Sequence, residues 1–481
     1  MRSSDRSRTI AAAGVLGALV HGYDTSFTSP STLQAHIPRT QAQSGARSSG
    51  LGVMGAGAVA ACAATAAAVV RPGRPAKGSP GRHVGRTAAS ALNPDNFSDV
   101  CDQTGVTLNR YMIEANRQGV VDTDILSVMN SIREATKVIS KLVNTAPLAQ
   151  AELLGLEGAI NVQGEDQKKL DVITNDVLKK ALRYTGKLGT MASEEEDMPV
   201  SAALSLDLET TASGTVLSDT GKYVCVFDPL DGSSNVDAGI AVGTIFGIFK
   251  ESEESNAVCD LPANIKDLDG DQVSCLAATL QPGKALVAAG YVLYSCSTEL
   301  VFTLGRGVVG FTLDSSIGEY VLTRPSIEIP SRGKIYSCNE ANMENWDEPF
   351  QQYIKDIQTG NCETKNKYSL RYIGSMVGDV HRTLLYGGLF AYPADTKNKD
   401  GKLRLLYEAA PMSFLLEQAG GLAITGHSRV MDIPPVSVHQ RVPIILGSKD
   451  DVEECKKYYE KCDDPKLKER CANRLKGLVT A

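Results

Sequence analysis

Two carboxylates three residues apart close a short apolar run in the middle of the chain. Asp228 and Asp231 follow the run 223–227, and the proline and glycine beside them favour a turn where both acids leave the run. Carboxylate oxygens suit Mg²⁺ or Mn²⁺, and the amides and hydroxyls of the small residues 232–234 can approach phosphate oxygens closely. The segment therefore indicates a site for metal ions and phosphate. Taken alone, it also fits an ordinary Asp-Pro/Asp-Gly surface turn.

Two further segments supply the charges that such a site needs. Residues 193–197 read Ser-Glu-Glu-Glu-Asp, which alone is a solvated acidic loop. Lys402 and Arg404 precede Glu408, which opens an apolar helical pattern and alone is a charged helix start. Together the three segments provide carboxylates for a multi-metal cluster and cations for a phosphorylated substrate, as metal-assisted hydrolysis of a phosphate ester requires.

Helical and strand-like patterns alternate around these segments. In the first predicted helix, Ile125, Met129 and Ile132 recur at helical spacing. Helices are predicted at 124–144, 348–357, 376–386 and 411–419. Strands are predicted at 223–227, 240–249, 285–294, 300–304, 320–323 and 389–392. This mixture, in a chain of 481 residues, predicts a layered α/β protein of two domains.

Further blocks make the chain resemble the fructose-1,6-bisphosphatases, and among them the plastid, redox-regulated form. The match runs from about Asn93 to Asp451 and includes DQKKLDV at 166–172, VGTIFG at 242–247 and RYIGSMV at 371–377. The aspartate turn alone also fits the inositol phosphatases and the seven-carbon sugar bisphosphatases, and the other blocks narrow the choice.

The resemblance implies the α/β sugar-phosphatase fold, with layers in the order α-β-α-β-α and two mixed α/β domains that meet near Ser326. Residues 93–326 would form the N-terminal domain, which holds the metal site and a regulatory loop at 250–281. Residues 327–481 would form a C-terminal domain that binds the sugar phosphate.

The resemblance also implies the residues that hold the metal and activate water. Ligands for Mg²⁺ or Mn²⁺ would be Glu194, Asp228, the Leu230 carbonyl, Asp231, Glu408 and Glu165, the last standing where the family commonly has Asp. Asp171 and Glu195 match the pair that orients and deprotonates the attacking water. Crowded carboxylates cannot all ionise freely, so one of such a pair is ready to take a proton.

Contacts to the substrate follow from the same resemblance. They would come from Gly232, Ser233, Ser234, Asn339, Arg371, Tyr372, Met376, Tyr392, Lys402 and Arg404. Arg371 matches an arginine that the family donates across a subunit interface, which implies a homo-oligomer, expected to be a tetramer. Where the family often has a tyrosine after Asn339 and Glu340, this chain has Asn342, so we expect one phosphate contact to be missing or replaced.

The implied activity is Mg²⁺-dependent hydrolysis of the 1-phosphate of D-fructose 1,6-bisphosphate to fructose 6-phosphate and phosphate, in the Calvin cycle. Two alternatives stay open. One is a sedoheptulose-1,7-bisphosphatase or an enzyme of dual specificity. The other is a catalytically silent, redox-sensing interaction protein, which the complete set of core carboxylates disfavours.

The cysteines raise a question of regulation. The chain has 11 Cys with no CxxC pair, which argues against a zinc site and against a secreted disulfide framework. Cys259 and Cys275 bracket an acidic segment that resembles the extra loop of plastid bisphosphatases, whose cysteines form a disulfide that thioredoxin reduces. Two unpaired surface thiols are the alternative. Cys455, Cys462 and Cys471 lie on a charged tail and receive no role.

The first 92 residues differ in charge from the rest. They carry ten Lys/Arg and two Asp/Glu, a net of +8, which leaves 39 against 54, a net of −15, for the body. An acidic body argues against nucleic acid as a partner. The apolar stretches 10–20 and 51–70, with basic residues after them, resemble the multipartite leaders of algal plastid proteins. We expect the leader to be removed and the mature enzyme to lie in the plastid stroma without spanning a membrane, a membrane anchor being the alternative.

Overall fold

The computed structural model describes residues 105–149, 153–160, 166–202, 221–251 and 270–477. All of them lie within one compact unit, His83–Ala481. The expected leader, Glu165, Cys259 and residues 252–269 of the expected regulatory loop lie outside the described residues. In the part of the chain that is described, each helix is too short or too polar to cross a bilayer.

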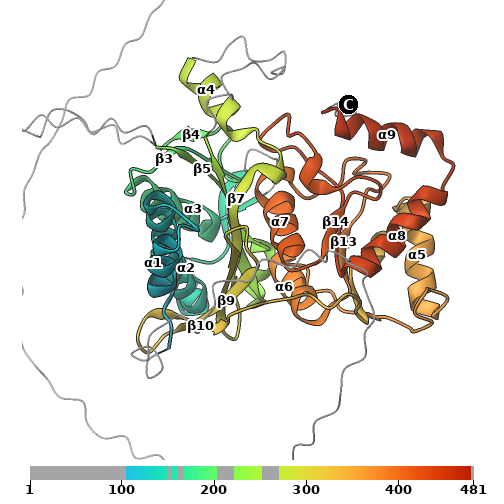
Figure 1. The fold of residues 1–481 in the computed structure, drawn as a ribbon, viewed down its shortest axis with the longest axis horizontal. Helices are drawn as coiled ribbons and strands as arrows, with labels where there is room; N and C mark the ends of the chain where they lie inside the picture. The colour runs from blue at the N-terminus through green and yellow to red at the C-terminus, as the bar shows by residue number, and fades with distance from the viewer. Residues whose placement is uncertain (1–104, 150–152, 161–165, 203–220, 252–269, 478–481) are drawn as a thin grey trace, which may run out of the picture. The chain divides into compact units, whose positions relative to one another are not determined.

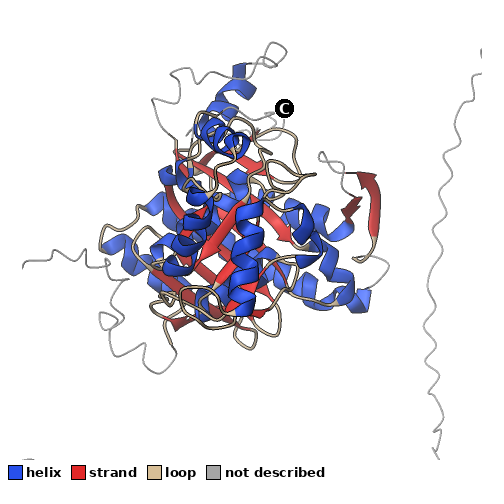
Figure 2. Cartoon of the chain, turned by 90° about the vertical axis from the view of Figure 1, so that its right-hand side faces the viewer, coloured by secondary structure: helices blue, strands red, loops and turns tan. Residues whose placement is uncertain are grey.

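Helices and sheets alternate in five layers, which confirms the predicted α-β-α-β-α order (Figure 1). The first layer holds α1 (Leu108–Arg117), α2 (Thr123–Ala149) and α3 (Lys169–Arg183). The central helices, between the two sheets, are α6 (Met376–Tyr386) and α7 (Ala410–Gln418). The last layer holds α5 (Glu348–Thr359), α8 (Lys449–Lys461) and, farther along the chain, α9 (Pro465–Leu475). Seen from the side, most strands lie between helices, and a pair of strands projects at the right (Figure 2).

The first sheet carries the aspartate pair. Its strands are β3 (Leu188–Ser193), β4 (Val200–Ser201), β5 (Tyr223–Asp231), β6 (Val242–Lys250), β7 (Leu286–Tyr294), β8 (Thr298–Thr303), β9 (Val308–Asp314) and β10 (Glu319–Arg324). They pair in the order β10-β9-β8-β7-β6-β5-β3-β4, and β3 and β5 are parallel. Every residue of β5 is buried, since helices cover both faces of the sheet, and the strand therefore reads as a continuous apolar run.

The second sheet supplies the opposite side of the fold. Its strands are β11 (Ile335–Ser337), β12 (Ser369–Leu370), β13 (Leu389–Tyr392), β14 (Leu422–Ile424) and β15 (Ile444–Gly447). They pair in the order β12-β11-β13-β15-β14. A separate antiparallel hairpin joins β1 (Leu156–Ile160) to β2 (Asp166–Lys168). Helices α6 and α7 contribute Val377, Leu384 and Leu415 to a core that packs between the two sheets.

The structure matches some predicted elements and extends others. Helix α6 and strand β13 have the predicted bounds. Strand β5, predicted to end at Phe227, continues past Pro229 to Asp231 with a shift of register between Asp228 and Asp231. Proline has no amide hydrogen to give to a neighbouring strand, and its carbonyl instead accepts from the Thr244 hydroxyl at 2.8 Å. Both aspartates therefore lie in the bulged end of the strand.

The tail at the C-terminus is not simply a charged surface segment. Helices α8 and α9 each have a buried face, on which Cys455 and Cys471 contribute to the core together with Tyr459. The polar composition of this region hid a narrow apolar face, because most of its residues point outward.

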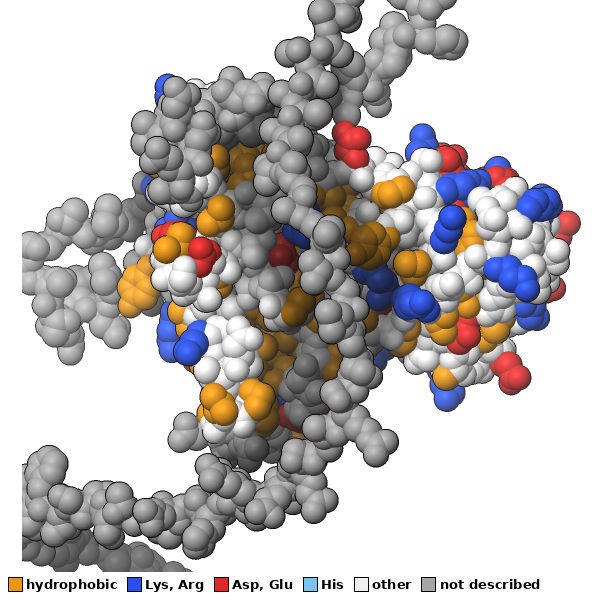
Figure 3. All heavy atoms as spheres, turned by 90° about the horizontal axis from the view of Figure 1, so that it is seen from below, with side chains coloured by type: hydrophobic (Ala, Val, Ile, Leu, Met, Phe, Trp, Pro, Cys, Tyr) orange, Lys and Arg blue, Asp and Glu red, His pale blue; other side chains and the backbone are white. Residues whose placement is uncertain are grey.

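The surface seen from below carries charges of both signs (Figure 3). Over the right-hand side, where α5 and α8 lie in Figure 1, Lys and Arg are interspersed with Asp and Glu. Surface pairs in this region include Lys457 with Glu363, at 2.7 Å, and Lys456 with Glu460, at 3.6 Å.

Candidate active site

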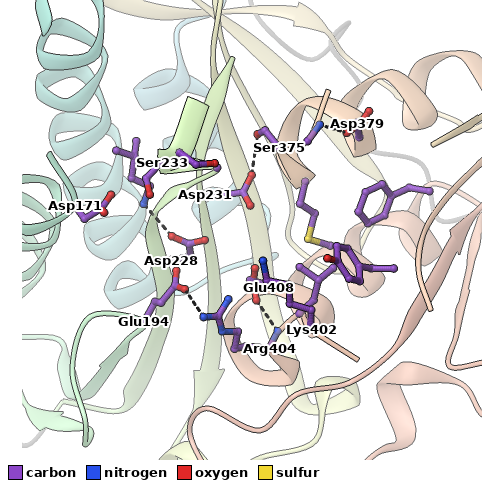
Figure 4. A pocket seen from close by; sticks show the side chains of 18 of the residues that line it. Asp171, Glu194, Asp228, Asp231, Ser233, Ser375, Asp379, Lys402, Arg404 and Glu408 are labelled. Carbon is purple, nitrogen blue, oxygen red and sulfur yellow. Dashed lines mark hydrogen bonds and ion pairs between the residues drawn. The ribbon is translucent and has the colours of Figure 1, made fainter. Parts of the chain in front are cut away.

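The aspartate pair lies where β5 meets the start of α6. The Leu230 amide donates to Oδ1 of Asp228 over 2.9 Å. The Asp231 carboxylate accepts from the Ser375 hydroxyl at 3.0 Å and from the Val377 amide at 2.9 Å. These bonds hold two buried carboxylates in fixed orientations that face the same space (Figure 4).

Glycine is needed directly after the pair. Gly232 has a φ of +76°, and a Cβ at this position would lie 2.8 Å from the Cβ of Ser375. A side chain would therefore strain the turn and separate it from α6. The 3₁₀ helix Ser233–Ala238 begins here, and the amides at its N-terminal end suit an anion.

A third carboxylate comes from the second half of the chain. Glu408 lies in the π-helical turn Leu405–Ala409 before α7 and is 3% exposed. One of its oxygens accepts from the Arg404 amide at 2.5 Å. Among the described residues, Asp228, Asp231 and Glu408 each offer an oxygen, and these oxygens lie within 4.8 Å of one another.

Negative charge is concentrated at this point. Burial, together with the charge of the neighbouring Glu194 carboxylate, raises the pKa of Asp231 to about 6 and that of Glu408 to about 8. Burial and the charges of Glu194, Asp231 and Glu408 raise the pKa of Asp228 well above its ordinary value. Such a cluster is stable in its ionised form only with a cation, and an all-oxygen set of buried carboxylates fits a hard divalent ion such as Mg²⁺ or Mn²⁺.

The four acids of the loop 194–197 do not share one role. Glu194 and Glu195 line the cavity, and Glu194 forms an ion pair with the Arg404 guanidinium at 3.2 Å. Glu196 turns toward α3 instead, where it accepts from the Asn175 amide at 3.0 Å and pairs with Lys179. Asp197 is exposed. The loop thus presents two carboxylates to the cavity and anchors itself with the third.

Asp171 lies in the first turn of α3, at the edge of the cluster. Its Oδ2 accepts from the Lys168 amide at 3.0 Å. Its Oδ1 is buried and has no hydrogen-bond partner among the described residues. Burial, together with the charge of Glu194, raises the pKa of Asp171 to about 7, although the hydrogen bond from the Lys168 amide acts in the opposite direction. A carboxylate with this pKa can take up a proton near neutral pH.

The carboxylates line one wall of a cavity of about 430 Å³. The cations Lys402 and Arg404 line the same cavity beside Glu408, and the Arg404 guanidinium points toward Glu194 (Figure 4). Of the residues named from the sequence, the cavity brings together Asp171, Glu194, Glu195, Asp228, Leu230, Asp231, Gly232, Ser233, Ser234, Asn339, Tyr372, Met376, Tyr392, Lys402, Arg404 and Glu408. Arg371 does not line it and is exposed, with Nη1 donating to the Leu370 carbonyl at 2.7 Å.

The cavity also has walls that the sequence did not indicate. The added residues are Lys168, Gly374, Ser375, Asp379, Phe390 and Leu403. Asp379 accepts from the Ile373 and Gly374 amides, each at about 3 Å, and so fixes the turn before α6. A serine directly before a predicted helix with an acid in its first turn is a helix-start signal, and it could have identified Ser375 and Asp379.

The end of the expected regulatory loop packs near this site. Cys275 lies on α4 (Gly270–Thr279) and is partly buried. Leu276 and Ala278 of the same helix share a core with Val224 and Val226 of β5, the strand that bears the aspartate pair. Movement of α4 would therefore be transmitted to β5 through buried contacts.

Comparison with known proteins gives a consistent picture. The family model "Fructose-1-6-bisphosphatase, N-terminal domain" matches residues 106–325, and the corresponding C-terminal domain model matches residues 329–460. The chloroplastic fructose-1,6-bisphosphatase of Brassica napus is 49% identical over 352 residues, 73% of this chain and 81% of that protein. An Arabidopsis thaliana chloroplastic counterpart is also 49% identical, over 73% of this chain and 80% of its own length. The crystal structure of Leishmania major fructose-1,6-bisphosphatase in holo form has a TM-score of 0.64 at 39% identity, over 74% of this chain and 100% of that one.

Proposed function

The chain belongs to the fructose-1,6-bisphosphatase family, and from this premise we propose that it removes the 1-phosphate of fructose 1,6-bisphosphate in the Calvin cycle. The products are fructose 6-phosphate and phosphate. The observation that carries this function is the cavity that buried carboxylates share with the cations Lys402 and Arg404. The chloroplastic relatives support a location in the plastid, reached with the leader 1–92.

Enzymes of this family depend on a metal ion, and the donor set here favours Mg²⁺, with Mn²⁺ as a substitute. The residues that would hold it are Glu194, Asp228, Asp231, Glu408, the Leu230 carbonyl and Glu165. When bound, the metal neutralises the phosphate oxygens and lowers the pKa of a bound water. The three carboxylates within 4.8 Å of one another support this assignment, because their mutual repulsion is relieved by a cation.

The protein's own groups divide the remaining work. Asp171 and Glu195 orient the attacking water and take its proton, which the pKa of about 7 at Asp171 permits at neutral pH. Gly232, Ser233 and Ser234 hold the phosphate that leaves, through amides and hydroxyls at the start of the 3₁₀ helix. The sugar and its second phosphate are held by Asn339, Tyr372, Met376, Tyr392, Lys402 and Arg404.

Subunit contacts and the domain division belong to the same proposal. Arg371 is exposed and lies outside the cavity of its own subunit, which supports its donation to a neighbouring subunit of a tetramer. Residues 93–326 serve as the N-terminal domain with the metal site, and residues 327–481 serve as the sugar-phosphate domain. The cavity is built from both parts.

The activity is tested by phosphate release from fructose 1,6-bisphosphate and from sedoheptulose 1,7-bisphosphate, each with Mg²⁺ and with chelator. Turnover of the first sugar supports the proposal, and faster turnover of the second favours the seven-carbon alternative. Glu408→Gln should abolish release. As a control, Glu417→Gln should leave phosphate release unchanged, because Glu417 lies on α7, pairs with Arg429 and does not line the cavity. Failure of the wild type to release phosphate from either sugar would favour the silent interaction protein.

Regulation is tested on the oxidised enzyme. We propose that Cys259 and Cys275 form a disulfide that thioredoxin reduces, and the packing of α4 against β5 supports a path from this bond to the aspartate pair. Cys259→Ser and Cys275→Ser should each be active without reductant. An oxidised variant that stays inhibited would point to a different pair among the 11 cysteines.

A further inference from the structure

A segment far from the acidic loop in sequence connects that loop to the turn that carries Glu408. Residues 436–442 run beside residues 403–407, which precede Glu408. The Leu405 amide donates to the Gln440 carbonyl at 2.7 Å, and the Val442 amide donates to the Leu403 carbonyl at 2.8 Å. These backbone bonds, one and three residues after His439, hold the segment against the π-helical turn.

The His439 ring joins two parts of the cavity wall. Its Nδ1 lies 2.8 Å from the Tyr407 hydroxyl, and Tyr407 directly precedes Glu408. Its Nε2 lies 2.9 Å from the backbone carbonyl of Glu196, which follows the cavity acids Glu194 and Glu195. One imidazole thus connects the loop that bears two of the acids to the turn that bears Glu408.

The partners determine which nitrogen carries the proton. A carbonyl oxygen can only accept, so Nε2 of His439 donates to Glu196. In the neutral ring Nδ1 is then an acceptor, and the Tyr407 hydroxyl donates to it. Burial lowers the pKa of His439, which keeps the ring neutral at pH 7, although the Glu196 carbonyl acts in the opposite direction. Both ring nitrogens are used in this tautomer.

The uncharged hydrogen bonds of His439 matter because the ion pair that also joins the turn to the loop takes part in ligand binding. Arg404 and Glu194 also join the turn to the loop, through their ion pair at 3.2 Å. In the proposed function Glu194 binds the metal and Arg404 binds a phosphate, so their pairing weakens when both are loaded. The hydrogen bonds of His439 lie outside the cavity and involve neither Glu194 nor Arg404.

We propose that His439 is a positioning residue that holds the acidic loop in register with Glu408, so that carboxylates from two distant segments form one metal site. This rests on the proposed function for the identity of the metal site. His439 does not line the cavity and is not a ligand. Its effect is on Mg²⁺ affinity, through the backbone position of the ligand Glu194.

Two amides at this position separate the two contacts of the ring. In His439→Gln the amide nitrogen reaches the place of Nε2 and can donate to the Glu196 carbonyl. In His439→Asn the amide reaches only the place of Nδ1, and the link to Glu196 is lost. Loss of a group that orients a ligand typically weakens metal binding about 10-fold to 100-fold, and we expect this for Asn and a smaller loss for Gln.

The measurement is calorimetric titration of the metal-depleted protein with MgCl₂ alone, followed by the KM for fructose 1,6-bisphosphate at saturating Mg²⁺. KM should stay within about twofold of the wild type, because the sugar contacts are untouched. The matched control is His381, whose Nδ1 lies 2.8 Å from the Tyr291 hydroxyl in a similar edge-on ring contact, outside the cavity. His381→Asn should leave Mg²⁺ affinity unchanged.

Wild-type Mg²⁺ affinity in His439→Asn, or an equal loss in His381→Asn, overturns the proposal. If His439→Asn does not fold, Tyr407→Phe keeps the ring volume and removes one bond to His439, and unchanged Mg²⁺ affinity in that variant overturns the proposal as well. Failure of the proposed function is distinguishable. In that case the wild type binds Mg²⁺ more tightly than His439→Asn but releases no phosphate from fructose 1,6-bisphosphate.

Discussion

Two groups of buried carboxylates in this protein differ in what neutralises them. In the C-terminal part, Asp451 accepts from the Gly333 amide at 2.8 Å and the Tyr368 hydroxyl at 2.7 Å. The Arg332 guanidinium pairs with Asp451 at 3.3 Å and with Glu454 at 2.6 Å. The charges of these two acids are neutralised within the protein, because the Arg332 cation and several hydrogen-bond donors surround them.

In the cavity, Arg404 pairs with Glu194 at 3.2 Å, whereas the hydrogen bonds that the structure describes at Asp228, Asp231 and Glu408 come from backbone amides and one hydroxyl. Asp231 accepts from neutral donors, and its nearest charged neighbours include other acids. Burial raises the pKa of Asp231 and also that of Asp451, so burial alone does not separate the two groups. In the proposed function the cavity acids bind a metal ion, whereas Asp451 and Glu454, which share the Arg332 cation, are part of the framework.

The largest expected effect is that of Asp231→Asn, which tests whether the cavity acids bind a metal ion. The change removes one proposed ligand and one negative charge, so we expect phosphate release to fall below detection even at saturating Mg²⁺. Without metal, the unfolding temperature should be equal to or higher than that of the wild type, because repulsion in the cluster is relieved. Substantial turnover in this variant would show that Asp231 is not a ligand.

Neighbouring acids of the loop provide the next largest contrast. Glu195→Gln should leave Mg²⁺ binding nearly intact and lower kcat about 10²-fold to 10⁴-fold, which is the usual contribution of a general base. Glu196→Gln changes the acid that anchors the loop to Asn175 and Lys179, and its effect on kcat should be much smaller. If Mg²⁺ affinity falls as steeply as the rate in Glu195→Gln, Glu195 is a ligand and not part of the base pair.

Substitution of Asp451 should affect stability and not turnover, the opposite of what we expect for Asp231. Asp451→Asn leaves Arg332 without one of its buried partners, and we expect a loss of about 3 kcal/mol in the free energy of unfolding. Turnover per folded molecule should be retained. Denaturant unfolding and phosphate release measured on the same preparation make the comparison, and a stable but inactive Asp451→Asn would contradict it.

The pH dependence of stability sharpens the comparison further. Burial raises the pKa of Glu408 from an ordinary 4.5 to about 8, so the folded protein holds this proton more tightly than the unfolded chain does. Its contribution to stability is complete below about pH 4 and is lost as the pH rises through about 8. Relative to Glu408→Gln, metal-free wild type should lose about 2–4 kcal/mol between pH 5 and pH 9.

Thermal unfolding of both proteins in chelator, at intervals across this pH range, measures the difference. Mg²⁺ added at high pH should restore the wild type and leave Glu408→Gln little changed. A constant difference between the two proteins at all pH values would mean that Glu408 is ionised throughout.

Local patterns predicted the parts of the fold that local chemistry determines. Helix α6 follows from apolar spacing that ends at a glycine pair, and its bounds, Met376–Tyr386, agree with the prediction. The π-helical turn before α7 was not predicted, because its geometry depends on bonds to Gln440 and not on periodicity. Residues 188–193 were missed as a strand for a similar reason, since β3 pairs in parallel with β5.

The candidate site divides in the same way. Residues within recognisable motifs, such as Asp228 and Glu408, could be named from the sequence. The partners that hold them could not, because Ser375 reaches Asp231 across 144 positions and His439 reaches Glu196 across 243. No spacing rule connects residues so far apart. The assignment of Arg332 to the framework likewise needed the fold, since its partner Glu454 lies 122 positions away.

The most direct test of the proposed metal site is the number of protons released when Mg²⁺ binds. Calorimetric titration of metal-free protein at pH 7, in buffers of different ionisation enthalpy, gives this number. The raised pKa values of Glu408 and Asp228 lead us to expect release of about one proton, declining toward pH 9 and reduced in Glu408→Gln. Mg²⁺ binding with no proton release at pH 7, or the same release in Glu408→Gln, would contradict the account.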